Sequence, residues 1–328
     1  MNGSHATGGR LVAVLSAGFA LGGLLSACGS SSAGKSGDSG SCRIGFAFSN
    51  TTVTLYKPLI AAVNAEAKAK GCTVLQSFAN GDAQKQVSDV QTWVGEGVSS
   101  IVLLPLDAST VGPVMSQAHK HNIKVVGYAA KLDGEDGSAT FGNAEAGKEE
   151  GQRIAAWLTA QGLTSAEVAV MNEPTSLIST QRTDGTVAAL KAAFPGAKLV
   201  STIKGQTAAD GLQAMQSILV AHPNIKVFIS GADDAILGAN RALASAHKSP
   251  TSVLFAAFDG SAQCLQQIQS GTLNAIDAGL NLKTVGKSIA DAGYNVVHNQ
   301  QPLDVVVPYV VISQENKDAA TQLLSDNQ

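Results

Sequence analysis

Residues 42–78 read CRIGFAFSNTTVTLYKPLIAAVNAEAKAKGCTVLQSF and contain one complete strand–helix–strand unit. The apolar runs at 42–48 and 72–78 have the length and composition of strands. Between them, residues 57–70 carry alanines and leucines at helical spacing and stop before Gly71, which is typical of a helix C-terminus. Because a right-handed unit of this kind sets its two strands parallel, the stretch predicts an α/β fold with a parallel sheet.

The two cysteines of this stretch stand at the starts of the two predicted strands. Parallel neighbouring strands begin side by side, so Cys42 and Cys72 come within disulfide range. We therefore predict a Cys42–Cys72 disulfide, whose closed loop of about thirty residues would stabilise the fold by roughly 3–4 kcal/mol. Two buried free thiols are the alternative. Cys264 is expected to be a buried small hydrophobe and not a reactive thiol.

The alternation of strands and helices continues along the chain and forms two successive series. Strand-length apolar runs occur at 43–48, 73–78, 100–104, 124–128 and 138–141, and again at 167–171, 198–203, 227–230, 253–258 and 273–278. Helical patterns lie between them, at 83–97 behind the N-cap candidate Asp82, at 180–194 and at 208–222. Two doubly wound parallel-sheet lobes are therefore predicted.

The first forty residues have the features of an export signal. Arg10 precedes an apolar run over 11–25, which is shorter than the roughly 20 residues of a membrane-spanning helix. The run closes on Leu25-Ser26-Ala27-Cys28, which resembles the bacterial lipobox and implies a signal peptide over 1–27 and a lipid thioether on Cys28. An ordinary secretory signal with a chance cysteine is the alternative. Residues 28–41 are rich in Gly and Ser and predict a flexible tether, so we expect an extracytoplasmic protein anchored to the cell membrane.

Composition and motifs exclude several classes of function. With a formal net charge of −3 and scattered lysines, the chain has no basic patch for nucleic acid. It also shows no Gly-x-Ser-x-Gly elbow, no phosphate-binding glycine loop with lysine, and no metal-ligand cluster. The nearest approaches, His119 with His121 and Asp233 with Asp234, would have diverging side chains. We therefore expect no enzyme, no cofactor and no metal.

The order of short motifs resembles the type I periplasmic binding proteins of sugar ABC transporters, and most closely the ribose-binding members of that family. The matching segments are NGDAQKQ at 80–86, EGVSSIVLLP at 96–105, QRTDG at 181–185, AHP at 221–223, DDAILGA at 233–239 and FDG at 258–260. The resemblance implies two lobes, 42–142 plus 280–307 and 143–279 plus 308–328, that close on a ligand. Three hinge crossings would fall near Gly142-Asn143, Gly279-Leu280 and Val307-Pro308.

Ligands of open α/β sheets bind beyond the carboxyl ends of the strands, and this places the candidate site. The residues expected there are Ser49, Asn50, Tyr56, Asp107, Tyr128, Lys131, Gln206, Asp233 and, in a turn at 277–279, Asp277. The resemblance adds Arg182 to grip hydroxyls or a carboxylate, Asp259 to accept from hydroxyls, and Phe258 as a stacking face. In the alternative interpretations Arg182 forms a surface ion pair near Asp184, Asp259 caps the next helix, and Tyr56 belongs to the core.

The chain also departs from the family pattern at ligand-facing positions. Ala129 and Ala130 stand where the family has an Asp-Arg pair, and Leu104 and Ala232 replace asparagines. Gln206 replaces an aromatic residue, and Gly279 or its neighbour replaces a glutamine. Because hydrogen bonds lost from a buried site are costly, ribose bound in the family manner is disfavoured. We expect a roomier cleft, more apolar on its first-lobe side, with Tyr128 or Lys131 as substitutes. A larger or deoxy sugar, a polyol, or a less polar acid held by Arg182 remain open.

Taken together, these features predict a lipid-anchored binding protein of an ABC importer. It would act as a monomer, capture a sugar or polyol, and deliver it to permease and ATPase subunits. An extracytoplasmic sensor using the same clamp is the alternative, and the sequence does not separate the two.

Overall fold

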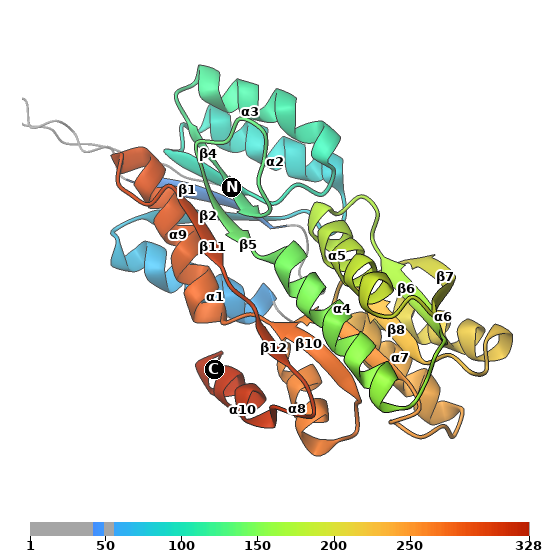
Figure 1. Ribbon diagram of the computed structural model, residues 1–328. Helices are drawn as coiled ribbons and strands as arrows, with labels where there is room; N and C mark the ends of the chain where they lie inside the picture. Colours follow the sequence, from blue (N-terminus) through green and yellow to red (C-terminus); the bar gives the residue numbers. More distant parts are fainter. Residues whose placement is uncertain (1–41, 49–55, 328) are drawn as a thin grey trace, which may run out of the picture. The chain divides into compact units, whose positions relative to one another are not determined.

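The computed structural model describes residues 42–48 and 56–327 (Figure 1). The predicted signal peptide, Cys28, the tether, Ser49 and Asn50 lie outside the described residues. Helices and strands alternate along the chain and form two sheets, so the predicted fold class is confirmed. We call each sheet with the helices packed on it a lobe.

The first lobe is built on a parallel sheet of strand order β11-β5-β4-β3-β1-β2. Its strands are β1 (Arg43–Phe48), β2 (Thr73–Phe78), β3 (Ser100–Leu103), β4 (Lys124–Ala129), β5 (Gly137–Phe141) and β11 (Asp304–Val307). One face packs on α1 (Tyr56–Ala69) and α9 (Leu282–His298), and the other on α2 (Ala83–Gly95) and α3 (Val111–Lys120), which follows the short 3-10 turn η1 (Ala108–Thr110). Residues alternate between the two cores along β1, where Phe46 faces the first and Ala47 the second.

The second lobe repeats this order as β12-β10-β9-β8-β6-β7. Its strands are β6 (Ala166–Asn172), β7 (Ala197–Lys204), β8 (Val227–Ser230), β9 (Leu254–Asp259), β10 (Ala275–Gly279) and β12 (Val310–Ile312), with β12 antiparallel to β10. Helices α4 (Asn143–Ala160) and α5 (Leu177–Ala193) cover one face. The other face carries α6 (Ala208–Ala221), α7 (Asp233–Ser245), α8 (Ala262–Ser270) and α10 (Lys317–Asp326).

The chain passes from one lobe to the other between β5 and α4, between β10 and α9, and between β11 and β12 (Figure 1). The crossings expected at Gly142-Asn143, Gly279-Leu280 and Val307-Pro308 fall within these three connections. Strands β11 and β12 were not foreseen, since each is only three or four residues long and β11 lies at an edge of its sheet.

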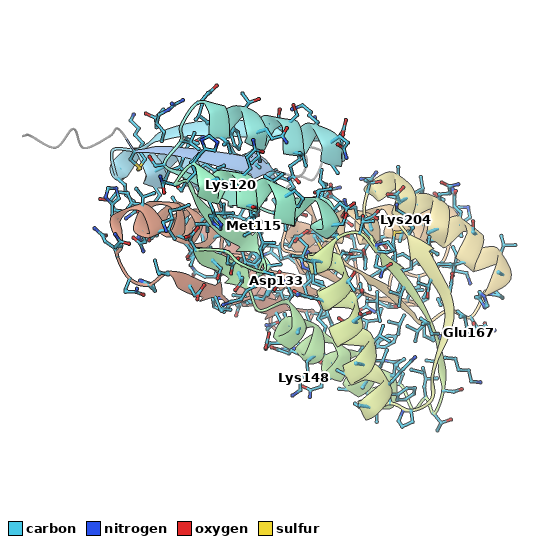
Figure 2. The ribbon with its side chains drawn as sticks, turned by 90° about the horizontal axis from the view of Figure 1, so that it is seen from above. Met115, Lys120, Asp133, Lys148, Glu167 and Lys204 are labelled. Carbon is cyan, nitrogen blue, oxygen red and sulfur yellow. A yellow bond between two sulfur atoms is a disulfide. The ribbon has the colours of Figure 1, made fainter. Side chains whose placement is uncertain are left out.

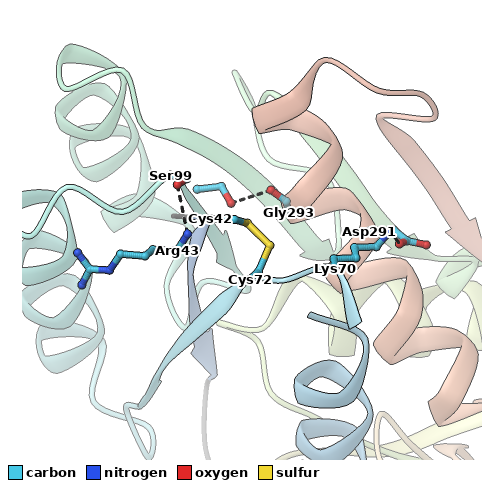
Figure 3. Close-up of a disulfide and its surroundings, with 8 residues drawn as sticks. Cys42, Arg43, Lys70, Cys72, Ser99, Asp291 and Gly293 are labelled. Atoms are coloured by element: carbon cyan, nitrogen blue, oxygen red, sulfur yellow. Dashed lines mark hydrogen bonds and ion pairs between the residues drawn. A yellow bond between two sulfur atoms is a disulfide. The ribbon is translucent and has the colours of Figure 1, made fainter. Parts of the chain in front are cut away.

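The predicted disulfide is confirmed. Cys42 and Cys72 are bonded across the starts of β1 and β2, where Arg43 pairs with Thr73 (Figure 3). Their Cα atoms are 4.6 Å apart, within the usual disulfide range. Cys264 is a buried free cysteine, as expected.

Local signals at helix ends also behave as predicted. The Asp82 side chain accepts a hydrogen bond from the Lys85 backbone at 3.0 Å and caps the start of α2. Gly71 follows α1 with a φ of +73°, a conformation that favours glycine.

The distribution of surface lysines and the character of the helices can be compared with what was expected for nucleic-acid binding and for a membrane span. Lys120, Lys148 and Lys204 are exposed on three different elements, α3, α4 and β7, in keeping with scattered lysines (Figure 2). Within residues 42–48 and 56–327, no helix has both the length and the apolar character needed to cross a bilayer.

Candidate functional site

A cavity of about 90 Å³ lies where strand ends of the first lobe face those of the second. The first lobe contributes Tyr56, Leu104, Pro105, Leu106, Tyr128 and Phe141. The second lobe contributes Glu173, Thr175, Ser176, Ile178, Ser179, Arg182, Gln206, Gly231, Ala232 and Asp259. Five predicted site residues, Tyr56, Tyr128, Arg182, Gln206 and Asp259, are therefore brought together.

The two walls of the cavity differ in chemistry. Among the described residues, the first-lobe wall carries only apolar side chains and two tyrosines, as expected. The second-lobe wall carries carboxylates, hydroxyls and a guanidinium group. The volume of about 90 Å³ is below the roughly 300–1,000 Å³ of typical ligand pockets. The cavity suits a small solute with one apolar and one polar side.

Arg182 is the centre of the polar wall. It lies on α5, one helical turn after Ile178, and is only 3% exposed. Its Nη1 donates to the Gly231 carbonyl at 2.8 Å and lies 2.9 Å from Asp259 Oδ1. The alternative of a surface ion pair near Asp184 is therefore wrong.

Asp259 and Arg182 form a buried ion pair. Burial raises the pKa of Asp259 to about 6 against the opposing charge of Arg182. Burial alone would lower the pKa of Arg182, but the Asp259 charge raises it, so the guanidinium stays charged. Ser261, not Asp259, caps α8 by accepting from the Cys264 backbone, so the alternative capping role of Asp259 is also wrong.

Two residues at the lobe crossings complete this group, and sequence reasoning missed both. Tyr309 accepts from Arg182 Nη2 at 2.7 Å and donates to Asn143 Oδ1 at 2.8 Å. Arg182 Nε reaches the same Asn143 oxygen at 3.3 Å, and Asn143 Nδ2 donates to the Ala129 carbonyl at 3.1 Å. The available signal was the position of Asn143 and Tyr309 beside two predicted crossings.

Phe258 occupies a different place from the one predicted. Its ring is fully buried, and the Arg182 guanidinium carbon lies 5.0 Å from the ring centroid. The Tyr309 ring is 5.6 Å from the same carbon. Because successive strand residues face opposite sides, Phe258 points into the second-lobe core while Asp259 reaches the cavity, so its ring supports Arg182 and not a ligand.

The aromatic residues of the first-lobe wall also belong to the core. Tyr128 is 4% exposed and meets Phe141 edge to face at a centroid distance of 5.6 Å. Burial raises the pKa of Tyr128 well above its usual value, so its hydroxyl is a neutral donor and acceptor. Tyr56 packs edge to face on Phe48 and lines the cavity, so the core interpretation and the site interpretation both hold for it.

Four other predicted residues lie outside the cavity. Asp107 closes a local turn by accepting from the backbone and hydroxyl of Ser109, and these bonds lower its pKa. Lys131 is exposed and lies 3.5 Å from Asp304. Asp233 and Asp277 are completely buried in the second lobe, and Asp277 lies inside β10 and not in a turn.

Sequence reasoning also missed the start of α5. Ser176 caps this helix by accepting from the Ser179 backbone at 3.3 Å, and Ser179 accepts from the Glu173 backbone at 3.0 Å. The available signal was Ser176 itself, since serine is a preferred N-cap residue. A helix that starts there places Ile178 and Arg182, four residues apart, on the same side of α5.

Comparisons with known proteins agree with this architecture. A family model described as a periplasmic binding protein domain matches residues 44–301. The ribose import binding protein RbsB of Bacillus subtilis is 25% identical over 81% of this chain and 85% of its own length. The xylitol-binding protein of Mycolicibacterium smegmatis is 24% identical over 78% of this chain and 73% of its own.

Solved structures show the same fold. An ABC transporter solute binding protein from Bacillus halodurans with bound myo-inositol superposes with a TM-score of 0.80 and 20% identity, covering 88% of this chain and 99% of its own. Another from Mycobacterium smegmatis with bound glycerol has a TM-score of 0.77 and 25% identity, covering 85% and 96%.

Proposed function

This chain belongs to the family of periplasmic binding protein domains, and on that premise we propose that it is the solute-binding component of an ABC importer for a small sugar or polyol. The observation that carries the proposal is the cavity between the lobes, with an apolar wall facing a polar one. A sugar or polyol has the same two-sided character, since its C–H faces pack on aromatic rings while its hydroxyls need donors and acceptors.

The polar wall supports a neutral ligand over an acid. Arg182 uses four of its five N–H groups on Asn143, Gly231, Asp259 and Tyr309, and its charge is balanced by Asp259. A ligand carboxylate would add a negative charge beside Asp259 and Glu173 with no free cation to balance it among the described lining residues. Hydroxyls can instead donate to Asp259 and accept from the remaining Nη2–H.

Capture would work by hinged closure. Ligand contacts to Tyr128 on one wall and to Gln206 and Asp259 on the other stabilise the state in which the lobes are together. We place the hinges at Gly142-Asn143, Gly279-Leu280 and Val307-Pro308, with lobes of residues 42–142 plus 280–307 and 143–279 plus 308–328. Permease and ATPase subunits would receive the solute from a monomer.

The location we propose, outside the cytoplasm and anchored to the cell membrane, rests on the family and on the N-terminal sequence. The periplasmic binding protein family implies a place outside the cytoplasm, and the lipobox supports an anchor on Cys28. A sensor with the same ligand remains the second candidate, and the partner bound by the loaded protein separates the two.

The test is a thermal-shift series with neutral sugars, polyols and sugar acids. A ligand at one hundred times its Kd stabilises the folded protein by about 2.7 kcal/mol, which raises Tm by several degrees. We expect a neutral sugar or polyol to do so, and a response confined to carboxylates would contradict the proposal.

A matched pair of variants ties the response to the cavity. Tyr128→Phe removes a hydroxyl from the cavity wall, whereas Tyr294→Phe removes one on α9, beside His298. We expect the first to weaken binding about tenfold, the value of one hydrogen bond of about 1.4 kcal/mol, and the second to leave it unchanged. Equal effects would show that the solute binds elsewhere.

A further inference from the structure

Three side chains that the proposed function does not use meet in the core of the second lobe. Asp233 starts α7, Cys264 lies on α8 and Asp277 lies on β10. All three are completely buried, and one ligand atom from each lies within 4.8 Å of the others. Carboxylate groups are unusual in a core unless they are paired or bound to something.

The carboxylates of this cluster have few hydrogen bonds. Asp233 Oδ2 accepts from the Ser261 backbone at 2.7 Å. Its Oδ1 is buried without a hydrogen bond in the described part of the chain, and the Asp277 oxygens lack a hydrogen bond of normal geometry there. Burial raises the pKa of Asp277, and the Cys264 thiol and the Gly260 N–H are the donors that act on this carboxyl to lower it. Buried carboxylate oxygens without normal hydrogen bonds, grouped with a thiol, point to a bound species.

The charge balance of the lobe gives the same indication. Glu150, Asp233, Asp259 and Asp277 are buried acids, and Asp234 is 8% exposed. Arg182 is the buried cation among residues 42–48 and 56–327, and Asp259 already pairs with it. A cation next to Asp233 and Asp277 would balance these charges, and protonation of the pair is the alternative.

We propose that Asp233, Cys264 and Asp277 form a binding site for one divalent cation of the zinc type. A thiolate with two carboxylates is a donor set that zinc accepts, with bonds of about 2.0–2.3 Å. The three donors lie within 4.8 Å of one another and would move closer together around the ion. Magnesium and calcium prefer oxygen ligands only, so the thiol selects against them. The sequence predicted no metal, and the three members of this group stand far apart in it, on three separate elements.

A bound ion would stabilise the second-lobe wall of the cavity near Ala232 and Asp259. Asp233 directly follows Ala232, which lines the cavity, and it holds the backbone of Ser261 two residues beyond Asp259. An ion here would fix the ends of β8 and β9 that position Arg182 and Asp259. Without an ion, burial and the neighbouring acids raise the pKa of Asp233 and Asp277, so a shared proton is the competing occupant.

The experiment uses the full chain with Cys28→Ser, so that Cys264 is the one cysteine outside the disulfide. The protein is unfolded in guanidinium with chelator and its disulfide intact, then refolded with zinc, cobalt, magnesium or no metal. Native mass spectrometry gives the bound metal, and cobalt absorption reports a thiolate ligand. We expect one zinc or cobalt per chain, a thiolate-to-cobalt band, and no retained magnesium.

Variants then test the assignment. Cys264→Ala and Asp277→Asn should each weaken zinc binding at least about tenfold, and Cys264→Ala should abolish the cobalt band. Glu149→Gln, on the exposed side of α4, is the control and should bind as the parent does. Near-ultraviolet circular dichroism checks folding, and Cys264→Ala serves alone if Asp277→Asn does not fold.

The proposal is overturned if the refolded parent retains no zinc, or if cobalt binds without a thiolate band. In the first case, a higher Tm of Asp277→Asn without metal would assign the site to a shared proton. Both readouts are independent of sugar binding, so this inference and the proposed function stand or fall separately.

Discussion

The two lobes share one strand order but end their equivalent fourth strands differently. β4 ends at Ala129 and β9 at Asp259, and both residues have positive φ, 64° and 114°. At Ala129 only a methyl group and the carbonyl are offered, and the carbonyl accepts from Asn143. At Asp259 the carboxylate pairs with Arg182. The topology therefore determines where a site lies, and the residue at each strand end determines what it can bind.

The largest expected effect on stability comes from removing the positive charge of Arg182, which pairs with Asp259 at the end of β9. Arg182→Met leaves Asp259 buried without its partner, and we expect a loss of about 3–5 kcal/mol in the free energy of unfolding. Denaturant titration measures it. Arg153→Met, which breaks the exposed pair with Glu149, is the control and should lose at most about 1 kcal/mol.

The comparison is sharpened by a second variant. Adding Asp259→Asn to Arg182→Met removes the stranded charge and should restore part of the lost stability. If Arg182→Met alone loses less than about 1 kcal/mol, the two strand ends are energetically alike and the contrast drawn between them is wrong.

A second difference is covalent, since the disulfide described here lies in the first lobe. Cys42→Ala with Cys72→Ala opens a loop of 30 residues, and the loop-entropy relation gives a loss of about 3–4 kcal/mol. We expect this loss in the first lobe, and unfolding that is no longer a single transition.

The two tryptophans allow each lobe to be followed separately. Trp93 lies on α2 of the first lobe and Trp157 on α4 of the second. With either tryptophan replaced by Phe, the remaining one reports its own lobe by fluorescence. Equal shifts of both transitions would mean that the lobes unfold as one unit and that the bond does not act locally.

The sequence predicts the fold well because alternation and caps are local signals. The ranges expected for β1, β2 and β8 match the observed strands, and Asp82 caps α2 as expected. The site is predicted less well because it depends on the direction in which each side chain points and on contacts between residues far apart in the sequence. Phe258 turns inward, Tyr309 is brought to Arg182 by a crossing, and Asp277 lies inside a strand, where a buried carboxylate is not expected from its sequence alone.

The smallest expected effect comes from the pKa shifts of one buried or half-buried carboxyl group in each lobe. In the first lobe, Asp136 lies 2.8 Å from Lys124 and 2.9 Å from His119 and accepts from the Val125 backbone at 2.8 Å. Burial would raise the pKa of Asp136, but these partners together lower it. In the second lobe, burial raises the pKa of Glu150 well above its usual value, with the Asp277 charge adding to the effect.

The two shifts have opposite consequences for pH dependence. A lowered pKa in the folded state gives Asp136 a stabilising contribution that is present above its usual pKa and is lost as the pH falls below about 4. A raised pKa makes Glu150 destabilising as the pH rises above its usual pKa. We therefore expect Asp136→Asn to lose about 1 kcal/mol at pH 7 and little near pH 3, while Glu150→Gln gains stability at pH 7 and little near pH 4. Denaturant titrations across this pH range measure the change in the free energy of unfolding of each variant. Changes of the same sign would mean that the two carboxyl groups have pKa shifts in the same direction, and the contrast between the lobes would be wrong.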